Sequence, residues 1–252
     1  MLLSIVIPAF NEGEKLERTV ERLEYALTST NLVRDSWEII VCDNNSTDRT
    51  AAIASSLGAT VVYEPVNQIS RARNTGATIA KGKWLLFLDA DSFPSPQLMT
   101  DVLEVIGNRN IVGCGATVSV EDGTPFNRLR MERLNPLFRA LRLSGGAFLL
   151  CRRDAFWSIG GFSTDLYALE DIEFVLRLKR YGRSIGNAFI VLHKHPVITS
   201  GRKGEYRLSS MLALVSSNII ALVLFALHFV LPRRWVGALG ARLLQYWYRS
   251  PR

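Results

Sequence analysis

Cysteine is scarce in this chain, and its three cysteines lie far apart. Cys42, Cys114 and Cys151 form neither a CxxC pair nor a cysteine and histidine spacing that binds zinc. This pattern argues against a disulfide framework and favours a reducing compartment. The chain also lacks a GxGxxG after its first apolar run, where only Gly13 occurs, and a P-loop, because the glycine spacing before Lys83 is one residue too long. Any phosphate binding would therefore have to rest on a metal and on cationic side chains.

The N-terminal apolar run ends at Pro8, and it has neither a basic leader nor a small-residue cleavage site. We therefore expect a buried strand there and not a signal peptide. The chain has 252 residues, of which 48% are hydrophobic, a length that suits one large domain or two small ones. The organisation that we predict is one α/β domain over residues 1–204, followed by a hydrophobic and basic helical appendage over residues 205–252.

Positive charge exceeds negative charge in this sequence. A formal net charge of +7 favours an anionic partner, and nucleotide phosphates, acidic lipid and nucleic acid all meet that condition. Much of the excess lies in the second half, where a solvated basic face and attraction to anionic lipid are the two alternatives. The basic residues concerned are Arg128, Arg130, Arg133, Arg139, Arg142, Arg152, Arg153, Arg202, Lys203, Arg233 and Arg234.

Short apolar runs alternate with helical patterns in the first half of the chain. The runs cover residues 2–7, 37–42, 60–63 and 84–88, and Asn11 followed by Glu14 predicts a helix N-cap between the first two. Such alternation predicts a mostly parallel sheet that is covered on both faces. After residue 110 the alternation is less regular, with apolar runs at 111–118, 147–150 and 189–192 and helices predicted at 154–159 and 171–181.

Ligands of such sheets bind at the carboxyl ends of the strands, where this sequence places acidic residues. Asp89 and Asp91 follow the apolar run "WLLFL", and in an extended backbone two residues at i and i+2 point the same way. Two carboxylates that converge suit a hard cation such as Mg²⁺ or Mn²⁺, although Asp-x-Asp is also common in turns. Arg71 and Arg73 open the preceding helix, and an ion pair with Asp89 or contact with a phosphate are the alternatives for Arg73.

Six motifs occur in an order that resembles family 2 glycosyltransferases. They are "SIVIPAFNE" at 4–12, "VCDNNSTDRT" at 41–50, "ARNTGATIAKG" at 72–82, "LFLDADS" at 86–92, "GGF" at 160–162 and "EDIEFVLRLKRYG" at 170–182. The resemblance covers about the first 200 residues. It implies a GT-A fold with a mixed sheet flanked by helices, a nucleoside-diphosphate-sugar donor such as a UDP- or GDP-sugar, and an inverting transfer. Residues 1–110 would then bind the donor and residues 111–204 the acceptor.

The resemblance also implies a role for each matching residue on the donor side. Asp43 would bind the base, although the family more often has Asp-Asp-Gly where this chain has Asp43-Asn44-Asn45. Asp89 would face the ribose and the metal, and Asp91 would be the main protein ligand of a Mn²⁺ or Mg²⁺ ion that bridges the diphosphate. The loop that lines the nucleotide would consist of Pro8, Ala9, Phe10, Asn11 and Glu12.

On the acceptor side, Asp171 matches the family's proposed general base. We expect the helix dipole to keep Asp171 ionised there, and a plain N-cap is the alternative role. Glu170 would position the acceptor, and the glycines before Ala147 allow a sugar to approach the backbone at Gly146, or form only a turn. In "LHKHPVITSGRK", at 192–203, Arg202 would clamp the diphosphate and His193 would complete the metal shell.

The stretch from 211 to 231 contains 21 residues without a formal charge. Its length suits a bilayer span or a segment that lies on the membrane. The alternative is a helix that packs on the domain or on a second protomer, so an oligomer could form through the C-terminal helices. We expect the protein to be cytoplasmic, at the cytoplasmic face of the membrane, with no nucleic acid as a partner.

The function that we predict is a metal-dependent inverting glycosyltransferase that acts on a lipid-linked or small hydroxyl or phosphate acceptor. A retaining GT-A glycosyltransferase or a sugar nucleotidyltransferase is the first alternative, since both share the nucleotide half and the Asp-x-Asp motif. A sugar-nucleotide-binding membrane adaptor without catalytic activity is the second alternative. The acidic residues Asp43, Asp89, Asp91 and Asp171 favour an enzyme over an adaptor.

Overall fold

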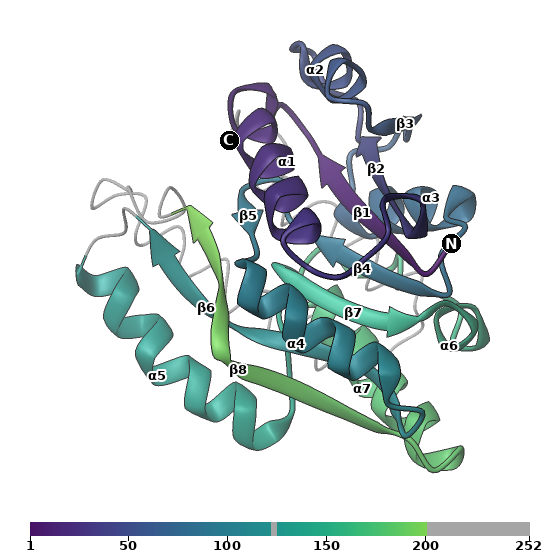
Figure 1. Ribbon diagram of the computed structural model, residues 1–252, viewed down its shortest axis with the longest axis vertical. Coiled ribbons are helices and arrows are strands. Elements are labelled where there is room, and N and C mark those ends of the chain that lie inside the picture. Colours follow the sequence, from purple (N-terminus) through teal and green to yellow (C-terminus); the bar gives the residue numbers. More distant parts are fainter. Residues whose placement is uncertain (122–124, 201–252) are drawn as a thin grey trace.

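The computed structural model describes residues 1–121 and 125–200, which form one eight-stranded sheet with helices on both faces (Figure 1). The strands are ordered β3-β2-β1-β4-β7-β6-β8-β5. They span Leu3–Ala9 (β1), Trp37–Asp43 (β2), Thr60–Tyr63 (β3), Trp84–Leu88 (β4), Ser92–Phe93 (β5), Ile111–Glu121 (β6), Phe148–Arg152 (β7) and Ala188–Ser200 (β8). The α-helices span Gly13–Thr28 (α1), Thr50–Ser56 (α2), Ile69–Ile79 (α3), Pro96–Gly107 (α4), Pro125–Leu141 (α5), Arg153–Ser158 (α6) and Glu170–Ser184 (α7), and a 3-10 helix covers Arg34–Ser36.

The first half of the sheet is parallel, as predicted. β1 lies between β2 and β4, and β3 pairs with the outer side of β2. Ile5 and Ile7 of β1 pack in a hydrophobic cluster with α1 and α4, whereas Val6 packs in a second cluster with α3, α6 and α7. The strands are nearly continuous in apolar residues because helices cover both faces of the sheet.

The second half of the sheet is mixed, as the family resemblance implied. β7 runs antiparallel to both β4 and β6, and β6 and β8 are parallel. The sequence patterns missed α4, α5 and β5. α4 starts with an N-cap at Ser95, whose side chain accepts a hydrogen bond from the backbone N–H of Leu98 at 3.1 Å.

A bulge in β8 brings the end of this strand back to the end of β4. Leu192 pairs with Ala116 and Val197 pairs with Val118, so four residues of β8 face a single residue of β6. Beyond the bulge, β8 pairs antiparallel with β5, the short strand that follows the two aspartates. Two segments about 110 residues apart in sequence therefore meet at one edge of the site.

No helix in the described ranges 1–121 and 125–200 is long and apolar enough to cross a membrane. The apolar stretch 211–231, Arg202 and the rest of the predicted appendage lie outside the described residues.

Candidate active site

The loop after β1 is fastened to the loop after β2. Asn11 has a left-handed backbone with φ of 53°, and its side-chain oxygen accepts a hydrogen bond from the backbone N–H of Thr47 at 2.8 Å. The backbone N–H of Asn11 in turn donates to Ser46 Oγ at 3.0 Å. α1 starts after Glu12, so the prediction that Asn11 caps this helix is wrong. Asn11 instead holds the shape of the loop at the sheet edge.

The predicted donor residues lie together at this edge. Pro8 and Ala9 are the buried last residues of β1, and Phe10 to Glu12 form a half-buried loop between the ends of β2 and β4. Asp43 ends β2 with 7% of its surface exposed, and its Oδ1 accepts a hydrogen bond from the backbone N–H of Ser46 at 3.0 Å. The sheet thus places the predicted nucleotide loop between Asp43 and Asp89, at the edge where ligands of parallel sheets bind.

Asn44, whose contribution the sequence left open, fixes the segment that leads into α3. Its amide nitrogen donates to the carbonyl of Val66 at 2.6 Å, and its side-chain oxygen accepts from the backbone N–H of Gln68 at 2.9 Å. Asn44 is buried, with 4% of its surface exposed. Its amide satisfies both a backbone donor and a backbone acceptor, which a carboxylate at this position could not do.

The backbone between Asp89 and Asp91 is not extended, although the predicted convergence of the two carboxylates assumed that it was. The chain turns between them, because the backbone N–H of Ser92 donates to the carbonyl of Asp89 at 3.0 Å. Asp91 instead faces the end of β8: its Oδ2 accepts a hydrogen bond from Ser200 Oγ at 3.0 Å, and its carbonyl accepts from Ser200 N at 3.1 Å. Thr199 Oγ1 also lies 3.4 Å from Asp91 Oδ1. The sequence patterns do not predict a role for these two hydroxyl groups.

Arg73 lies at the centre of the site and joins residues from both halves of the chain. Its Nη2 donates to Asp89 Oδ1 at 3.2 Å and its Nη1 donates to Glu170 Oε1 at 2.8 Å. Only 2% of the Arg73 side chain is exposed, and the guanidinium lies 5.1 Å from the ring centre of Phe162. Of the two alternatives for Arg73, the structure shows the ion pair with Asp89, and it adds Glu170 as a second partner. Glu170, which we predicted to position the acceptor, is buried in this network.

Gly146 is a glycine because the guanidinium of Arg73 occupies the space of a side chain. A Cβ atom at this position would lie 2.0 Å from Arg73 Nη2. The backbone N–H of Gly146 donates to Asp171 Oδ2 at 2.6 Å, and the other oxygen of Asp171 accepts from the backbone N–H of Ile172 at 2.7 Å. Gly146 is buried and its N–H is bound to Asp171, while the approach of a sugar to its backbone stays a prediction. Its absent side chain lets Arg73 and Asp171 lie beside each other.

Burial governs the protonation of the two acidic residues that start α7. It raises the pKa of Glu170 to about 7, with a further contribution from the charge of Asp171 and an opposing one from Arg73. Burial also raises the pKa of Asp171, although Arg73 and the N–H groups of Ile172 and Gly146 oppose the rise. Asp171 is the second residue of α7 and not its N-cap. Burial thus shifts the pKa of Asp171 in the direction opposite to the one expected from the helix dipole.

The predicted metal ligands form no closed metal site. Within residues 1–121 and 125–200, no group of three or more His, Cys, Asp or Glu side chains is placed to hold a metal ion. His193 lies in the β8 bulge beside a cavity, and its place in a metal shell stays a prediction. Asp91 still fits a cation that is shared with substrate phosphates. Among the described residues its carboxylate accepts hydrogen bonds only from hydroxyl groups, and a carboxylate has about four acceptor positions.

Two amide side chains of the α3 region, which sequence reasoning missed, fasten the loop before α7. Asn74 forms two hydrogen bonds with the backbone of Phe162, one from its Nδ2 to the carbonyl at 2.9 Å and one to its Oδ1 from the N–H at 2.9 Å. Gln68 Nε2 donates to the carbonyls of Thr164 and Leu166 at 2.8 and 3.1 Å. These bonds fix the "GGF" loop against α3, the helix that carries Arg73. The proximity of Asn74 to Arg73 in "ARNTG" is the only sequence signal for them.

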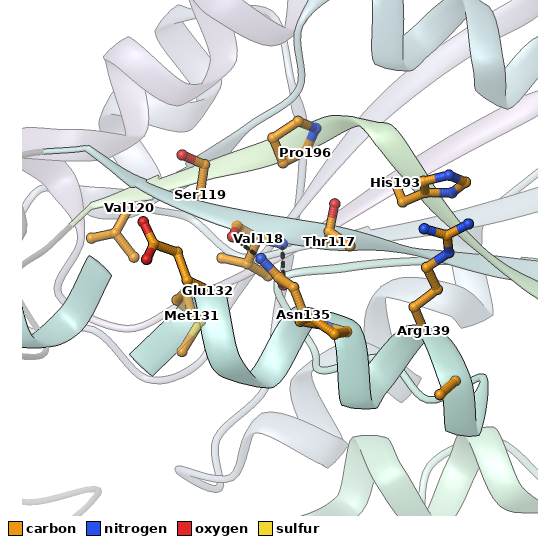
Figure 2. Close-up of a pocket in the computed structure, with 12 residues that line it drawn as sticks. Thr117, Val118, Ser119, Val120, Met131, Glu132, Asn135, Arg139, His193 and Pro196 are labelled. Carbon is orange, nitrogen blue, oxygen red and sulfur yellow. Dashed lines mark hydrogen bonds between the residues drawn. The ribbon is translucent and has the colours of Figure 1, made fainter. Parts of the chain in front are cut away.

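A cavity of about 880 Å³ lies between α5 and the outer parts of β6 and β8. Figure 2 shows Arg139 of α5 and His193 of β8 close together at one end of this cavity and Glu132 at the other. The side-chain amide of Asn135 bonds both the N–H and the carbonyl of Val118, at 3.0 and 2.9 Å. These bonds attach α5 to β6. The residues that line the cavity include none of the carboxylate network around Arg73.

Comparisons with known proteins agree with this geometry. Residues 4–163 match the family described as Glycosyl transferase family 2. An uncharacterized glycosyltransferase of Haemophilus influenzae is 32% identical over 191 residues, which are 70% of this chain and 62% of that protein. Glycosyltransferase AglE of Haloferax volcanii is 25% identical over 92% of this chain and 82% of its own length. The chain therefore spans less than two thirds of the Haemophilus relative.

Solved structures show the fold. The mannosyltransferase PcManGT from Pyrobaculum calidifontis, in complex with GDP-Man and Mn²⁺, superposes with a TM-score of 0.65 and 16% identity over 97% of this chain and 74% of that one. The mixed sheet flanked by helices is therefore of the GT-A type, as predicted. Since the family match covers more than half of the chain and includes the strands that carry Asp43, Asp89 and Asp91, the chain belongs to glycosyl transferase family 2.

Proposed function

We propose that this protein is an inverting glycosyltransferase that uses a nucleoside-diphosphate sugar and a divalent cation. The observation that supports this most is the position of Asp171. Its carboxylate is held by the N–H of Gly146, beside the guanidinium that also binds Asp89. A base is thereby fixed at a set position relative to the donor edge of the sheet, which is the arrangement that an inverting transfer requires.

In the proposed reaction, Asp171 accepts the proton of an acceptor hydroxyl. The hydroxyl oxygen attacks the anomeric carbon while the bond from that carbon to the diphosphate breaks, and the electron pair of that bond leaves with the diphosphate. The raised pKa of Asp171 suits a general base, because a more basic carboxylate takes up the proton more readily. Its two backbone hydrogen bonds keep the carboxylate oriented.

For the donor, we propose that Asp43 binds the base and that Asp89, held by Arg73, binds the ribose. Asp91 would hold a Mn²⁺ or Mg²⁺ ion, which would neutralise charge on the leaving diphosphate. PcManGT, a protein of the same fold, has been solved with GDP-Man and Mn²⁺, and TarS of S. aureus with UDP-GlcNAc. These complexes support a UDP- or GDP-sugar as the first candidates for the donor. Arg202, which lies outside the described residues, remains our candidate for a clamp on the diphosphate.

Two experiments test this proposal. The first is calorimetry of the full chain with UDP- and GDP-sugars, with and without Mn²⁺, which should give binding that depends on the cation. The second compares Asp171→Asn with Asp154→Asn, a surface control whose carboxylate pairs with Arg152. Removal of a general base lowers turnover by about 10² to 10⁴-fold, and donor binding should persist in both variants.

The results also separate the alternatives. Near-normal turnover of Asp171→Asn would rule out the inverting role of this residue and favour a retaining transferase or a sugar nucleotidyltransferase. Donor binding without transfer to any acceptor would favour an adaptor.

We also propose that the protein works at the cytoplasmic face of a membrane, with a lipid-linked or small acceptor. The basic second half and the uncharged stretch 211–231 support this location. Recovery of the full chain in the soluble fraction at low salt without detergent would contradict it.

A further inference from the structure

The outward face of α5 is apolar where a helix of a soluble domain is usually polar. Leu129, Leu137 and Leu141 have 46%, 50% and 51% of their surface exposed. With about 100° between successive residues, these positions fall within about 120° of one another, so the leucines form one stripe along the helix. Arg133 lies within the same stripe and is exposed.

The orientation of α5 is fixed, so this stripe cannot turn inward. Asn135 holds the inner side of the helix to β6 through its two hydrogen bonds with Val118. Figure 1 shows α5 at the outer edge of the molecule, beside β6 and β8. The exposure of the leucines therefore follows from how the helix is attached.

The positive charge of α5 and the residue after it indicates which kind of partner this face would bind. The segment 125–142 contains five arginines and one glutamate. Arg133 is exposed within the leucine stripe, and Arg142 is exposed just beyond the end of the helix. A helix with exposed leucines and several arginines matches the chemistry of an anionic bilayer surface, where apolar side chains enter the interface and arginines meet the headgroups. We propose that the outward face of α5 docks on an anionic lipid bilayer.

Docking through α5 would place the catalytic residues close to the membrane. The carbonyl of Leu141, the last residue of α5, accepts a hydrogen bond from Lys179 Nζ of α7 at 2.7 Å. Gly146, which holds Asp171, follows five residues later. This consequence rests on the proposed function, because it concerns an acceptor at the membrane. The docking itself is independent of catalysis.

The test uses the fact that all three native cysteines are buried. Leu137→Cys in the full chain introduces one exposed thiol, which is labelled with the environment-sensitive dye NBD. The matched control is Val33→Cys, at a residue with 70% of its surface exposed that lies outside α5. Both labelled chains are mixed with phosphatidylcholine vesicles with and without phosphatidylglycerol. We expect the emission at position 137 to shift to the blue and to lose quenching by iodide on the anionic vesicles, while position 33 stays accessible.

Two results would overturn the proposal. The first is quenching by iodide of the probe at position 137 while the chain is bound to anionic vesicles, as shown by co-flotation in a density gradient. Another part of the chain would then make the contact with the membrane. The second is a probe that is already shielded without vesicles, because another segment or a second copy would then cover the face. Arg133→Glu in the Leu137→Cys chain should reduce the blue shift. Calorimetry with the sugar-nucleotide donor, in the absence of vesicles, tests the proposed function separately. A failure of the proposed function can therefore be distinguished from a failure of membrane docking.

Discussion

Replacement of Arg73 by methionine is the most direct test of how the site is held together. Methionine has a similar length but no charge, and it leaves the carboxylates of Asp89 and Glu170 without their shared cation. Loss of one partner from a buried ion pair costs about 3 to 5 kcal/mol, because the remaining charge is buried without compensation. We expect Arg73→Met to lower the free energy of unfolding by this amount at pH 8.

The cost should depend on pH because of Glu170. Its pKa rises from 4.5 to about 7 in the folded chain, and since a tenfold change in proton affinity is worth about 1.4 kcal/mol, the rise corresponds to about 3 kcal/mol. A carboxyl group with a raised pKa contributes this stability below pH 4.5 and loses it as the pH rises through about 7. At pH 5 the protonated Glu170 needs no cation, so Arg73→Met should cost about 2 kcal/mol less there than at pH 8.

Urea unfolding at pH 5 and pH 8 measures both effects, and Arg152→Met provides a matched control. Arg152 forms an ion pair with Asp154 at 2.6 Å, but 34% and 60% of these side chains are exposed. A surface pair of this kind contributes about 0 to 1 kcal/mol. If Arg73→Met cost no more than Arg152→Met at pH 8, or lost the same stability at both pH values, the buried network would not have the energetic role that we assign to it.

Four further predictions follow from individual contacts. Gly146→Ala should destabilise the chain by about 1 to 3 kcal/mol in urea unfolding, because its Cβ would meet Arg73, whereas Gly107→Ala, which has open space, should not destabilise it. Asn74→Ala should cost about 1 to 3 kcal/mol in the same assay, because it leaves the backbone groups of Phe162 without partners. Cys42, Cys114 and Cys151 should react with DTNB at pH 8 only after unfolding, because they are buried and burial raises the pKa of each thiol, that of Cys42 to about 12. Asp91→Asn should reduce the enhancement of donor binding by Mn²⁺ in calorimetry, and equal enhancement in both proteins would exclude Asp91 as a ligand.

The first half of the fold could be predicted from sequence because its signals are local. Each strand from β1 to β4 appears as a short apolar run, and α1 shows a clear apolar stripe at Leu16, Val20, Leu23 and Leu27. The carboxyl ends of parallel strands must meet at one edge, so the placement of Asp43 and Asp89 followed from the order of the strands. The pairs β1–β2, β1–β4 and β2–β3 join strands of this half alone.

The second half depends on distant contacts, and the sequence patterns were weaker there. α5 contains Pro136 and several arginines, which hide its apolar stripe. The contact of Asp91 with Ser200 joins residues 109 positions apart and requires the bulge that lets β8 reach β5. The turn after β4 cannot be read from "DADS", since the same letters are compatible with an extended strand. The roles of Asn44, Asn74 and Gly146 likewise became clear only from their contacts.

The predicted donor half, residues 1–110, and acceptor half, residues 111–204, are not structurally separate. β7 comes from the second half but pairs with β4 of the first, so one continuous sheet carries both. Arg73 of the donor half is paired with Glu170 of the acceptor half, and the loop at Gly146 lies against its guanidinium. Three carboxylates, at positions 89, 170 and 171, thus surround this single guanidinium, which leaves an excess of negative charge when all are ionised. If the proposed donor binds here, its negatively charged diphosphate requires further positive charge beside this cluster. Binding of the donor would then be linked to the protonation state of Asp171.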